Sequence, residues 1–224
     1  MENTSKRNQV ASALGIIQII VALATIALSV YFYQNFPARV PIHWDINGEA
    51  NNWGSREFGA FLLPVIIVAI YFLFGVLSKI DPRKERYVEF AKAYSIIKTS
   101  LMLVFSAIYI VTSLNVLGYA VPIIFWIPFI IGVLFIVLGN YFGKIRNNYF
   151  VGIRTPWTLA NEEVWNKTHR LGGKLFIIGG VAMMFMGLIP ATLRLPILVA
   201  IILLIALVPM VYSYVLYRKT KTLG

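Results

Sequence analysis

The residues with side chains suited to chemistry lie in two polar segments of a mostly apolar chain. The first segment, 34–58, contains one of the two histidines, and the second, 140–174, combines Arg154, Glu163 and His169. A histidine with a carboxylate and a guanidinium nearby has the groups needed for acid–base catalysis. No base–nucleophile pair is evident, however, and the sequence lacks H-E-x-x-H, G-x-S-x-G and phosphate-binding glycine motifs. A structural, headgroup-binding loop is therefore favoured over an enzyme.

The apolar stretches around these segments predict a membrane protein with six spanning helices. Hydrophobic residues make up 59% of the chain and charged residues only 13%, against about 25% in a typical soluble domain. Stretches free of Asp, Glu, Lys and Arg are 8–38, 58–78, 99–143, 175–193 and 195–217. A spanning helix needs roughly 20 apolar residues, and Asn115, Gly118 and Pro122 mark a turn within the longest stretch. The predicted helices are 10–33, 59–78, 96–114, 121–140, 174–192 and 196–216.

The distribution of charge predicts that both termini lie in the cytoplasm. With the N-terminus inside, the inner segments hold 17 of the 20 basic residues and six of the nine acidic ones. The outer segments hold only Arg39, Arg56 and Arg194, balanced by three acidic residues. This asymmetry follows the positive-inside rule. It accounts for the whole net charge of +11, so no direct binding of nucleic acid is expected.

The N-terminal segment shares two features with a signal peptide, a Lys6-Arg7 pair and an Ala22-Leu23-Ala24 sequence within the apolar stretch. The stretch continues to Phe36, which is too long for the apolar region of a signal peptide. A retained first helix in a multi-pass protein of the cell membrane is therefore predicted.

Absent residue types narrow the possible functions further. The sequence contains no cysteine, so it can form neither a disulfide nor a thiolate metal site. No ionisable Asp, Glu, Lys or Arg lies in the middle of a predicted helix, which argues against a proton-coupled pump or a cation channel.

The outer segment is predicted to contain a small β-hairpin. Val40–Trp44 can be extended, and Asn47-Gly48 is a strong signal for a tight turn. The alternation of Asp and Asn between Asp45 and Asn51 hints at a calcium loop. Its glycine falls at the fourth position instead of the sixth, however, and no carboxylate occupies the twelfth. No metal or other cofactor is predicted.

The aromatic and polar residues of this hairpin have two interpretations. His43 is taken as a loop residue that is hydrogen-bonded to the backbone, and Trp44 and Trp53 are taken as anchors in the lipid headgroups rather than stacking surfaces. No other outer segment is large enough to carry specificity, so residues 40–57 are nevertheless predicted to contact an external ligand. The candidate contacts are His43, Trp44, Asp45, Gly48 and Trp53.

The inner segment is predicted to join an irregular loop to a short helix. Gly152 permits a positive φ, and Thr155 must be extended because it precedes a proline. Thr158 or Asn161 can cap the helix, and Gly172-Gly173 stops or bends it. The rigid loop would present Arg154 in a defined direction, either to a partner or to an acidic residue or lipid headgroup.

The short helix has two different faces. Val164, Trp165, Thr168 and Leu171 share one face, whereas Glu163, Lys167 and Arg170 share the other. An amphipathic helix of this kind is expected to lie flat on the inner membrane surface. Its charged face would then point to the cytosol.

The expected fold is therefore an all-α polytopic membrane protein in which residues 1–224 form a single integral membrane domain. Six transmembrane helices carry one outer β-hairpin-like loop and one inner amphipathic interfacial helix. Residues 1–80 contain the first two helices with the outer loop 34–58, residues 81–140 the next two, and residues 141–224 the inner loop and the last two.

Two motifs resemble those of a known family. The outer loop reads Val40-Pro-Ile-His-Trp-Asp-x-x-Gly-x-x-Asn-x-Trp-Gly-Ser-Arg, which is similar to the loop of an uncharacterised bacterial membrane domain. The inner segment reads Asn148-x-x-x-Gly152-Ile-Arg154-Thr-Pro-Trp-Thr158-Leu, followed by Asn161-Glu-x-Val-Trp165-x-x-Thr-His169-Arg-x-Gly172-Gly173. This second motif resembles the SdpI family, which combines both parts in this order. The resemblance covers residues 10–75 and 125–190.

The resemblance implies a bacterial immunity protein of the cytoplasmic membrane that meets a membrane-active killing peptide at its outer face. It also implies signalling, in which a cytosolic repressor is drawn to the inner face, and contacts with membrane lipids. A peptide transporter and a membrane enzyme acting on a lipid or peptide remain alternatives. The candidate partner-binding residues of the inner loop are Asn148, Gly152, Arg154, Thr155, Pro156, Trp157, Thr158, Glu163, Trp165, Lys167, His169 and Arg170.

Overall fold

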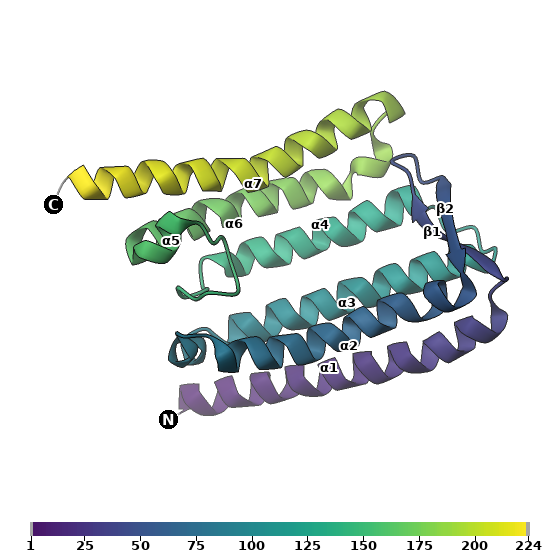
Figure 1. Cartoon of the computed structure of the whole chain (residues 1–224), viewed down its shortest axis with the longest axis horizontal. Helices are drawn as coiled ribbons and strands as arrows, with labels where there is room; N and C mark the ends of the chain where they lie inside the picture. Colours follow the sequence, from purple (N-terminus) through teal and green to yellow (C-terminus); the bar gives the residue numbers. More distant parts are fainter. Residues whose placement is uncertain (1, 223–224) are drawn as a thin grey trace.

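The long helices of the chain run between two opposite ends of the molecule (Figure 1). A computed structural model describes residues 2–222, and it describes side chains from Ala13 to Lys221. The longer elements are α1 (Glu2–Asn35), β1 (Arg39–Trp44), β2 (Ala50–Ser55), α2 (Arg56–Ile80), α3 (Ala91–Val116), α4 (Ile123–Phe142), α6 (Glu162–Met184) and α7 (Ala191–Thr222). Short helices between them are η1 (Lys84–Val88), α5 (Pro156–Ala160) and η2 (Met186–Leu188).

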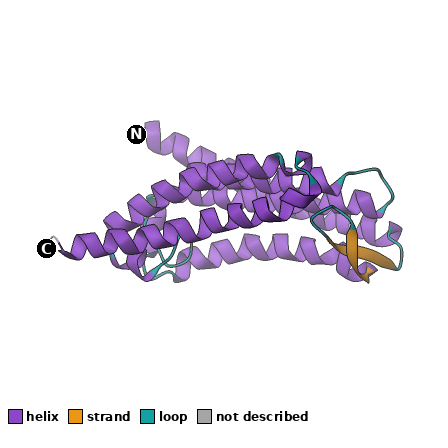
Figure 2. Cartoon of the chain, turned by 90° about the horizontal axis from the view of Figure 1, so that it is seen from above, coloured by secondary structure: helices purple, strands orange, loops and turns teal. Residues whose placement is uncertain are grey.

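The helices form two groups of three. In the first group α1, α2 and α3 pack against one another, and in the second group α6 packs against both α4 and α7. Contact between α3 and α4 joins the groups. The β1–β2 hairpin lies at one end, called the hairpin end, and both termini lie at the other, called the terminal end (Figures 1 and 2). This arrangement matches the predicted order of helices along the chain.

Five helices of the described residues are long and apolar enough to cross a membrane. They are α1 from Ala13, α2, α3, α4 and α7 up to Lys221. These helices expose large apolar side chains, such as Leu23 at 62%, Val65 at 62% and Phe72 at 63%. An exposed apolar surface of this extent suits contact with lipid rather than water. The chain is therefore a multi-pass helical membrane protein, as predicted.

The helix α6 differs from the prediction of a short interfacial helix followed by a separate spanning helix. It continues without a break from Glu162 to Met184, so Gly172-Gly173 does not stop it. Its face with Val164 and Trp165 is also buried in the protein, at 1% and 0% exposure, instead of lying on a membrane. The uncharged part of α6, residues 175–184, is shorter than the roughly 20 residues of a full span.

The glycines of α6 serve helix packing. A Cβ on Gly173 would lie 2.6 Å from the carbonyl oxygen of Gly139, and a Cβ on Gly180 would lie 2.6 Å from that of Gly132. The two glycine pairs let α4 and α6 approach backbone to backbone, as small residues do between helices in membranes. Gly172 leaves room for Ile153, whose Cδ1 would be 2.3 Å from an added Cβ. Close packing explains why these glycines do not end the helix.

Some predicted boundaries were also wrong. The helix α3 begins at Ala91 instead of residue 96, so Lys92 and Lys98 lie in its first turns. The last helix begins at Ala191, which places Arg194 in a helix rather than in a hairpin loop. Within the first group, α1 is hydrogen-bonded to α3, because Gln18 Nε2 donates to the Thr99 hydroxyl over 2.9 Å.

Candidate ligand cavity and inner loop

The hairpin is held in shape by its own turn. β1 and β2 pair antiparallel, and Gly48 adopts a φ of +82°, which confirms the predicted hairpin and turn. Asp45 Oδ1 accepts the amide protons of Asn47 over 2.8 Å and Glu49 over 3.0 Å. The bond from the Glu49 amide is the largest cause that lowers the pKa of the Asp45 carboxyl, so the turn carries a negative charge.

The hairpin is attached to both groups of helices. At its base, Val40 is fully buried in a cluster with Phe32, Phe36, Ala60 and Tyr109 of the first group. At its tip, the Arg194 guanidinium of α7 donates to Asn47 Oδ1 over 3.0 Å. A Cβ on Gly48 would lie 3.0 Å from the Ile124 amide nitrogen at the start of α4. The hairpin therefore bridges the gap between the two groups at this end.

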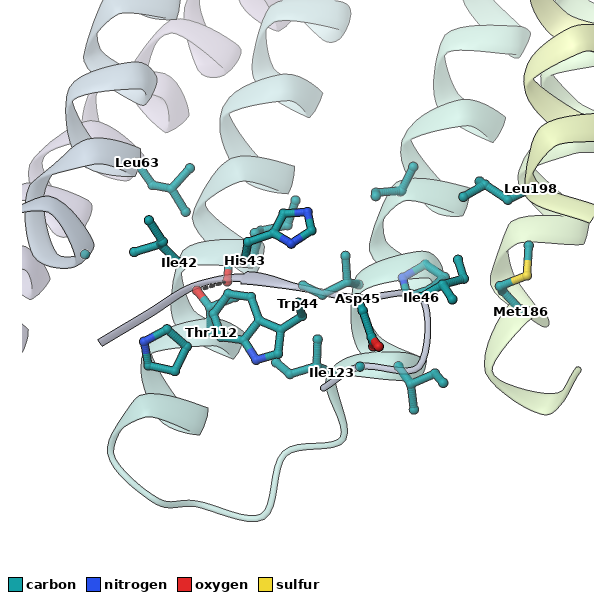
Figure 3. Close-up of a pocket in the computed structure, with 18 of the residues that line it drawn as sticks. Ile42, His43, Trp44, Asp45, Ile46, Leu63, Thr112, Ile123, Met186 and Leu198 are labelled. Atoms are coloured by element: carbon teal, nitrogen blue, oxygen red, sulfur yellow. Dashed lines mark hydrogen bonds between the residues drawn. The ribbon is translucent and has the colours of Figure 1, made fainter. Parts of the chain in front are cut away.

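Beneath the bridge lies a cavity of about 460 Å³. Its walls come from both helix groups and from β1, as Figure 3 shows with Leu63 on one side and Met186 and Leu198 on the other. The polar side chains on its wall are His43, Asp45 and Thr112. The apolar ones are Pro41, Ile42, Trp44, Ile46, Phe58, Leu62, Leu63, Ile108, Ile123, Ile124, Ile127, Pro128, Ile131, Met183, Met186 and Leu198. Such a cavity suits an apolar ligand with a polar or cationic end.

The structure brings four of the five predicted outer residues to this cavity. His43, Trp44, Asp45 and Gly48 line it, whereas Trp53 lies outside it on β2 and is 46% exposed. His43 Nδ1 is hydrogen-bonded to the Asn51 side chain over 2.6 Å, which corrects the predicted bond to the backbone. In Figure 3 the His43 ring and the Asp45 carboxylate lie on opposite sides of the strand.

The helical part of the cavity wall was missed by the sequence analysis. Its residues are ordinary apolar positions in uniformly apolar helices, so nothing in the pattern separates them from lipid-facing neighbours. The hydrogen bond between Arg194 and Asn47 was missed for a different reason. The two residues are 147 positions apart, and only the fold brings them together.

At the terminal end, Asp81 joins the loop after α2 to the loop before α5. This side chain is 2% exposed and accepts the Tyr87 hydroxyl over 2.9 Å and the Tyr149 amide over 3.0 Å. Burial, assisted by the neighbouring Asp81 carboxylate, raises the pKa of Tyr87, which keeps its hydroxyl protonated as a donor. Arg83 adds hydrogen bonds to the Asn147 side chain and to the Leu159 carbonyl.

Several residues of the inner motif hold the loop from within. Asn148 is fully buried, and its Oδ1 accepts the amides of Phe150 over 2.9 Å and Val151 over 2.7 Å. Thr155 is extended at φ −111° and ψ 162°, as predicted, and it forms a capping box with Thr158. The Thr155 hydroxyl also lies 3.0 Å from Ser213 of α7.

His169 and Trp165 lie in the interior of the protein. His169 is fully buried, stacks on Trp165 at 4.1 Å between ring centroids, and accepts the Ile153 amide at Nε2 over 2.9 Å. Its Nδ1 lies 2.8 Å from the Trp165 carbonyl, which requires a proton on this nitrogen. Burial lowers the pKa of His169 to about 4, so the ring is neutral. Gly152, at φ +114°, leaves the space that the ring occupies.

The remaining predicted inner residues lie nearer the surface. Arg154 is exposed and donates to the Tyr149 carbonyl over 2.7 Å. Glu163 and Lys167, on the predicted charged face, form an exposed ion pair with 2.6 Å between the charged atoms. Asn161, one of the two predicted caps, accepts the Val164 amide at the start of α6. The other three are Pro156, which is exposed, Trp157, which packs against Tyr214, and Arg170, which is exposed.

The two ends define a class of protein: a multi-pass helical membrane protein with a hairpin-covered apolar cavity at one end and a rigid polar loop at the other. Residues 144–213 match the SdpI/YfhL protein family, and residues 20–68 match a domain of unknown function, DUF1648. The immunity protein SdpI of Bacillus subtilis (strain 168) is 27% identical over 204 residues, which cover 91% of this chain and 96% of that protein. No solved structure matches the chain significantly.

These matches confirm the resemblance to the SdpI family that the two motifs indicate. The unknown domain covers the C-terminal part of α1, the hairpin and the first half of α2, and the SdpI/YfhL segment covers the inner loop, α6 and most of α7. The cavity is lined from both segments, by β1 and α2 on one side and by α6 and α7 on the other.

Proposed function

We propose that this chain is an immunity protein of the cell membrane that binds a membrane-active killing peptide in the cavity under the hairpin. The relative from Bacillus subtilis is named an immunity protein, and it is similar over 91% of this chain. The observation that supports the binding site is the 460 Å³ cavity, which joins a mostly apolar wall to the charged turn at Asp45. A peptide that inserts into membranes has apolar side chains for the wall, and a basic group on it would pair with Asp45.

Survival of cells exposed to the peptide tests this proposal. Leu63→Trp fills the cavity, whereas Leu73→Trp makes the same change on the same helix at a side chain that is 50% exposed and lies outside the cavity lining. We expect Leu63→Trp to lower survival toward that of cells without the protein and Leu73→Trp to have no effect. The amount of each variant in the membrane is measured in parallel. Full protection by a normally abundant Leu63→Trp variant would exclude the cavity as the binding site.

The same proposal includes an orientation in the membrane with six crossings. The terminal end carries most basic residues of the chain, whereas Arg39, Arg56 and Arg194 are at the hairpin end, so the positive-inside rule favours a cytoplasmic terminal end. The sixth crossing is α6, which packs between α4 and α7 (Figure 1). Its charged first half would lie at the inner surface, and its apolar half would reach into the membrane, where Ile178 and Val181 are 58% and 44% exposed.

A second function, recruitment of a cytosolic partner, is favoured by the exposure of Arg154 and of the Glu163–Lys167 pair beside a rigid loop. Arg154→Ala and a Glu163→Ala/Lys167→Ala double variant should lose recruitment without losing abundance or thermal stability. A drop in melting temperature in Arg154→Ala alone would show that Arg154 stabilises the loop instead of binding a partner. Unchanged recruitment in the double variant would exclude the exposed face with Glu163 and Lys167 as the partner-binding site.

The enzyme and transporter alternatives receive less support. A general base must be reachable by its substrate, whereas His169 is fully buried and both of its ring nitrogens are engaged. The cavity at the hairpin end is predominantly apolar, which suits capture of a peptide better than passage of a polar one.

A further inference from the structure

A second pocket lies at the terminal end, at the seam between the two helix groups. Its volume is about 470 Å³, and it is formed by Glu89 and Phe90 between η1 and α3, the first turn of α3, the end of α4 with the following loop, and α6. Four basic side chains line it, together with one acidic side chain: Lys92, Lys144, Arg146, Arg170 and Glu89. This polar pocket is separate from the cavity under the hairpin.

The charges of this pocket are not balanced within the protein. Glu89 pairs with Arg146, with 3.2 Å between the carboxylate oxygen and Nε. Among the described residues, no carboxylate forms an ion pair with Lys92, Lys144 or Arg170. Lys144 lies over the Tyr141 ring at 4.4 Å, which fixes the direction of its ammonium group. Three cations that converge on one pocket repel one another unless an anion joins them.

The first turn of α3 adds to the positive potential. This turn has no capping side chain and no acidic residue, and it contributes Lys92 and Ala93 to the pocket wall. The free amide groups at the start of a 26-residue helix favour an anion. The apolar part of the wall includes Phe90 and Ala93, which are 3% and 4% exposed, so the pocket is a concave site on a packed base.

The pocket also lies at the level where membrane spans end. The candidate spans of α3 and α4 run from Ala91 to Val116 and from Ile123 to Phe142, and the pocket is lined by residues next to two of these ends, Lys92 and Tyr141. In a bilayer, the ends of spans lie beside the lipid headgroups. Basic pockets between helices at the cytoplasmic surface suit phosphate-bearing headgroups.

We propose that this pocket binds the phosphate group of an anionic phospholipid. The guanidinium of Arg170 and the ammonium groups of Lys92 and Lys144 would surround the phosphate. The bound lipid would then join the two helix groups at the terminal end, as the hairpin does at the other end.

The test measures lipid binding to the purified full-length protein in a neutral detergent. The probes are dioleoyl phosphatidylglycerol, dioleoyl phosphatidylcholine and inorganic phosphate, and the readouts are lipid adducts in native mass spectrometry and the shift in melting temperature. A Lys144→Gln/Arg170→Gln double variant is compared with Lys84→Gln, an exposed residue of the same end that does not line the pocket. Lys92→Gln/Arg170→Gln is a second pocket variant, in case the first does not fold.

We expect phosphatidylglycerol to bind and to raise the melting temperature more than phosphatidylcholine. The pocket variants should bind phosphatidylglycerol at least about tenfold more weakly, while Lys84→Gln binds normally. Inorganic phosphate could raise the melting temperature as much as phosphatidylglycerol does, with the effect lost in the pocket variants. That result would support a phosphate site but assign it to a free anion rather than a lipid. Equal binding of both lipids, or unchanged phosphatidylglycerol binding in the pocket variants, would overturn the proposal.

Discussion

Among single residues, Asp81 connects the loop after α2 to the loop before α5 at the terminal end. Its carboxylate accepts the Arg83 amide over 2.7 Å in addition to the Tyr87 hydroxyl and the Tyr149 amide. Its burial, at 2% exposure, shows that this carboxylate stabilises the loop on which the inner motif lies.

Asp81→Asn should therefore lower the melting temperature of the purified protein. An amide has one oxygen and cannot accept all three donors, and a buried donor left without a partner costs about 1–3 kcal/mol. Glu85→Gln is the control, because it removes a charge from an exposed residue of the same loop. Equal melting temperatures for the two variants would show that the Asp81 bonds contribute little.

His169 should make the stability of the protein depend on pH. Its pKa is about 4 in the folded protein, against 6.5 as the ordinary value, because burial disfavours the charged ring. Between these values the unfolded chain binds a proton that the folded protein does not. Stability is therefore lost as pH falls from about 6.5 to about 4, by up to ~3 kcal/mol.

The measurement is the melting temperature of the purified protein between pH 7.5 and 4.5. In His169→Gln, whose side chain does not titrate, this part of the pH dependence should disappear, although the variant is less stable at pH 7.5. His43→Gln is the control, because it replaces the other histidine of the sequence at an exposed position. If melting temperature fell with pH in parallel for wild type and His169→Gln, the pH dependence would not come from His169.

Among the elements, α4 and α6 form the closest pair. Gly139 of α4 faces Gly173 of α6, and Gly132 faces Gly180 two turns further along. The spacing of seven residues on both helices keeps each glycine on the shared face. Glycine usually weakens a helix, but here the two glycine pairs form the contact surface between α4 and α6.

Gly139→Ala should destabilise the protein, whereas Gly75→Ala should not. A Cβ at position 139 would lie 2.5 Å from the Gly173 carbonyl oxygen, so the helices must move apart, at a cost of about 1–3 kcal/mol. At position 75 nothing lies within 4 Å, and alanine gains up to about 1 kcal/mol of helix propensity. Thermal unfolding should show shifts of opposite sign. A tolerated Gly139→Ala would contradict the close contact.

At the scale of the whole molecule, two groups of three helices are connected differently at their two ends. The hairpin bridges them at one end through Val40 and Asn47, and the Asp81 network links the loops at the other. The two pockets lie along this seam, one under the hairpin and one at the terminal end.

The two ends should lie on opposite sides of the membrane. The chain has no cysteine, so single cysteines at Glu49 in the hairpin turn and at Lys84 in η1, both exposed, can be labelled without background. A membrane-impermeant maleimide added to intact cells should label Glu49→Cys but label Lys84→Cys only after lysis. Labelling of both positions in intact cells would exclude the orientation with a cytoplasmic terminal end.

The features that depend on neighbours along the chain were predictable from the sequence. Apolar stretches located the helices, Asn47-Gly48 the hairpin turn, Gly152 the positive φ, and Thr155 before proline the extended residue. Each depends on local backbone sterics or on the length of an apolar run. The family resemblance also came from residues that are near one another in the sequence.

The features that depend on distant residues were decided only by the tertiary structure. The sequence cannot distinguish a glycine that ends a helix from one that packs against another helix, so Gly172-Gly173 suggested a break where α6 continues. It likewise could not show whether the apolar face with Trp165 meets lipid or protein, because both are apolar surroundings. The two pockets, the burial of His169 and the role of Asp81 arise from segments that only the fold brings together.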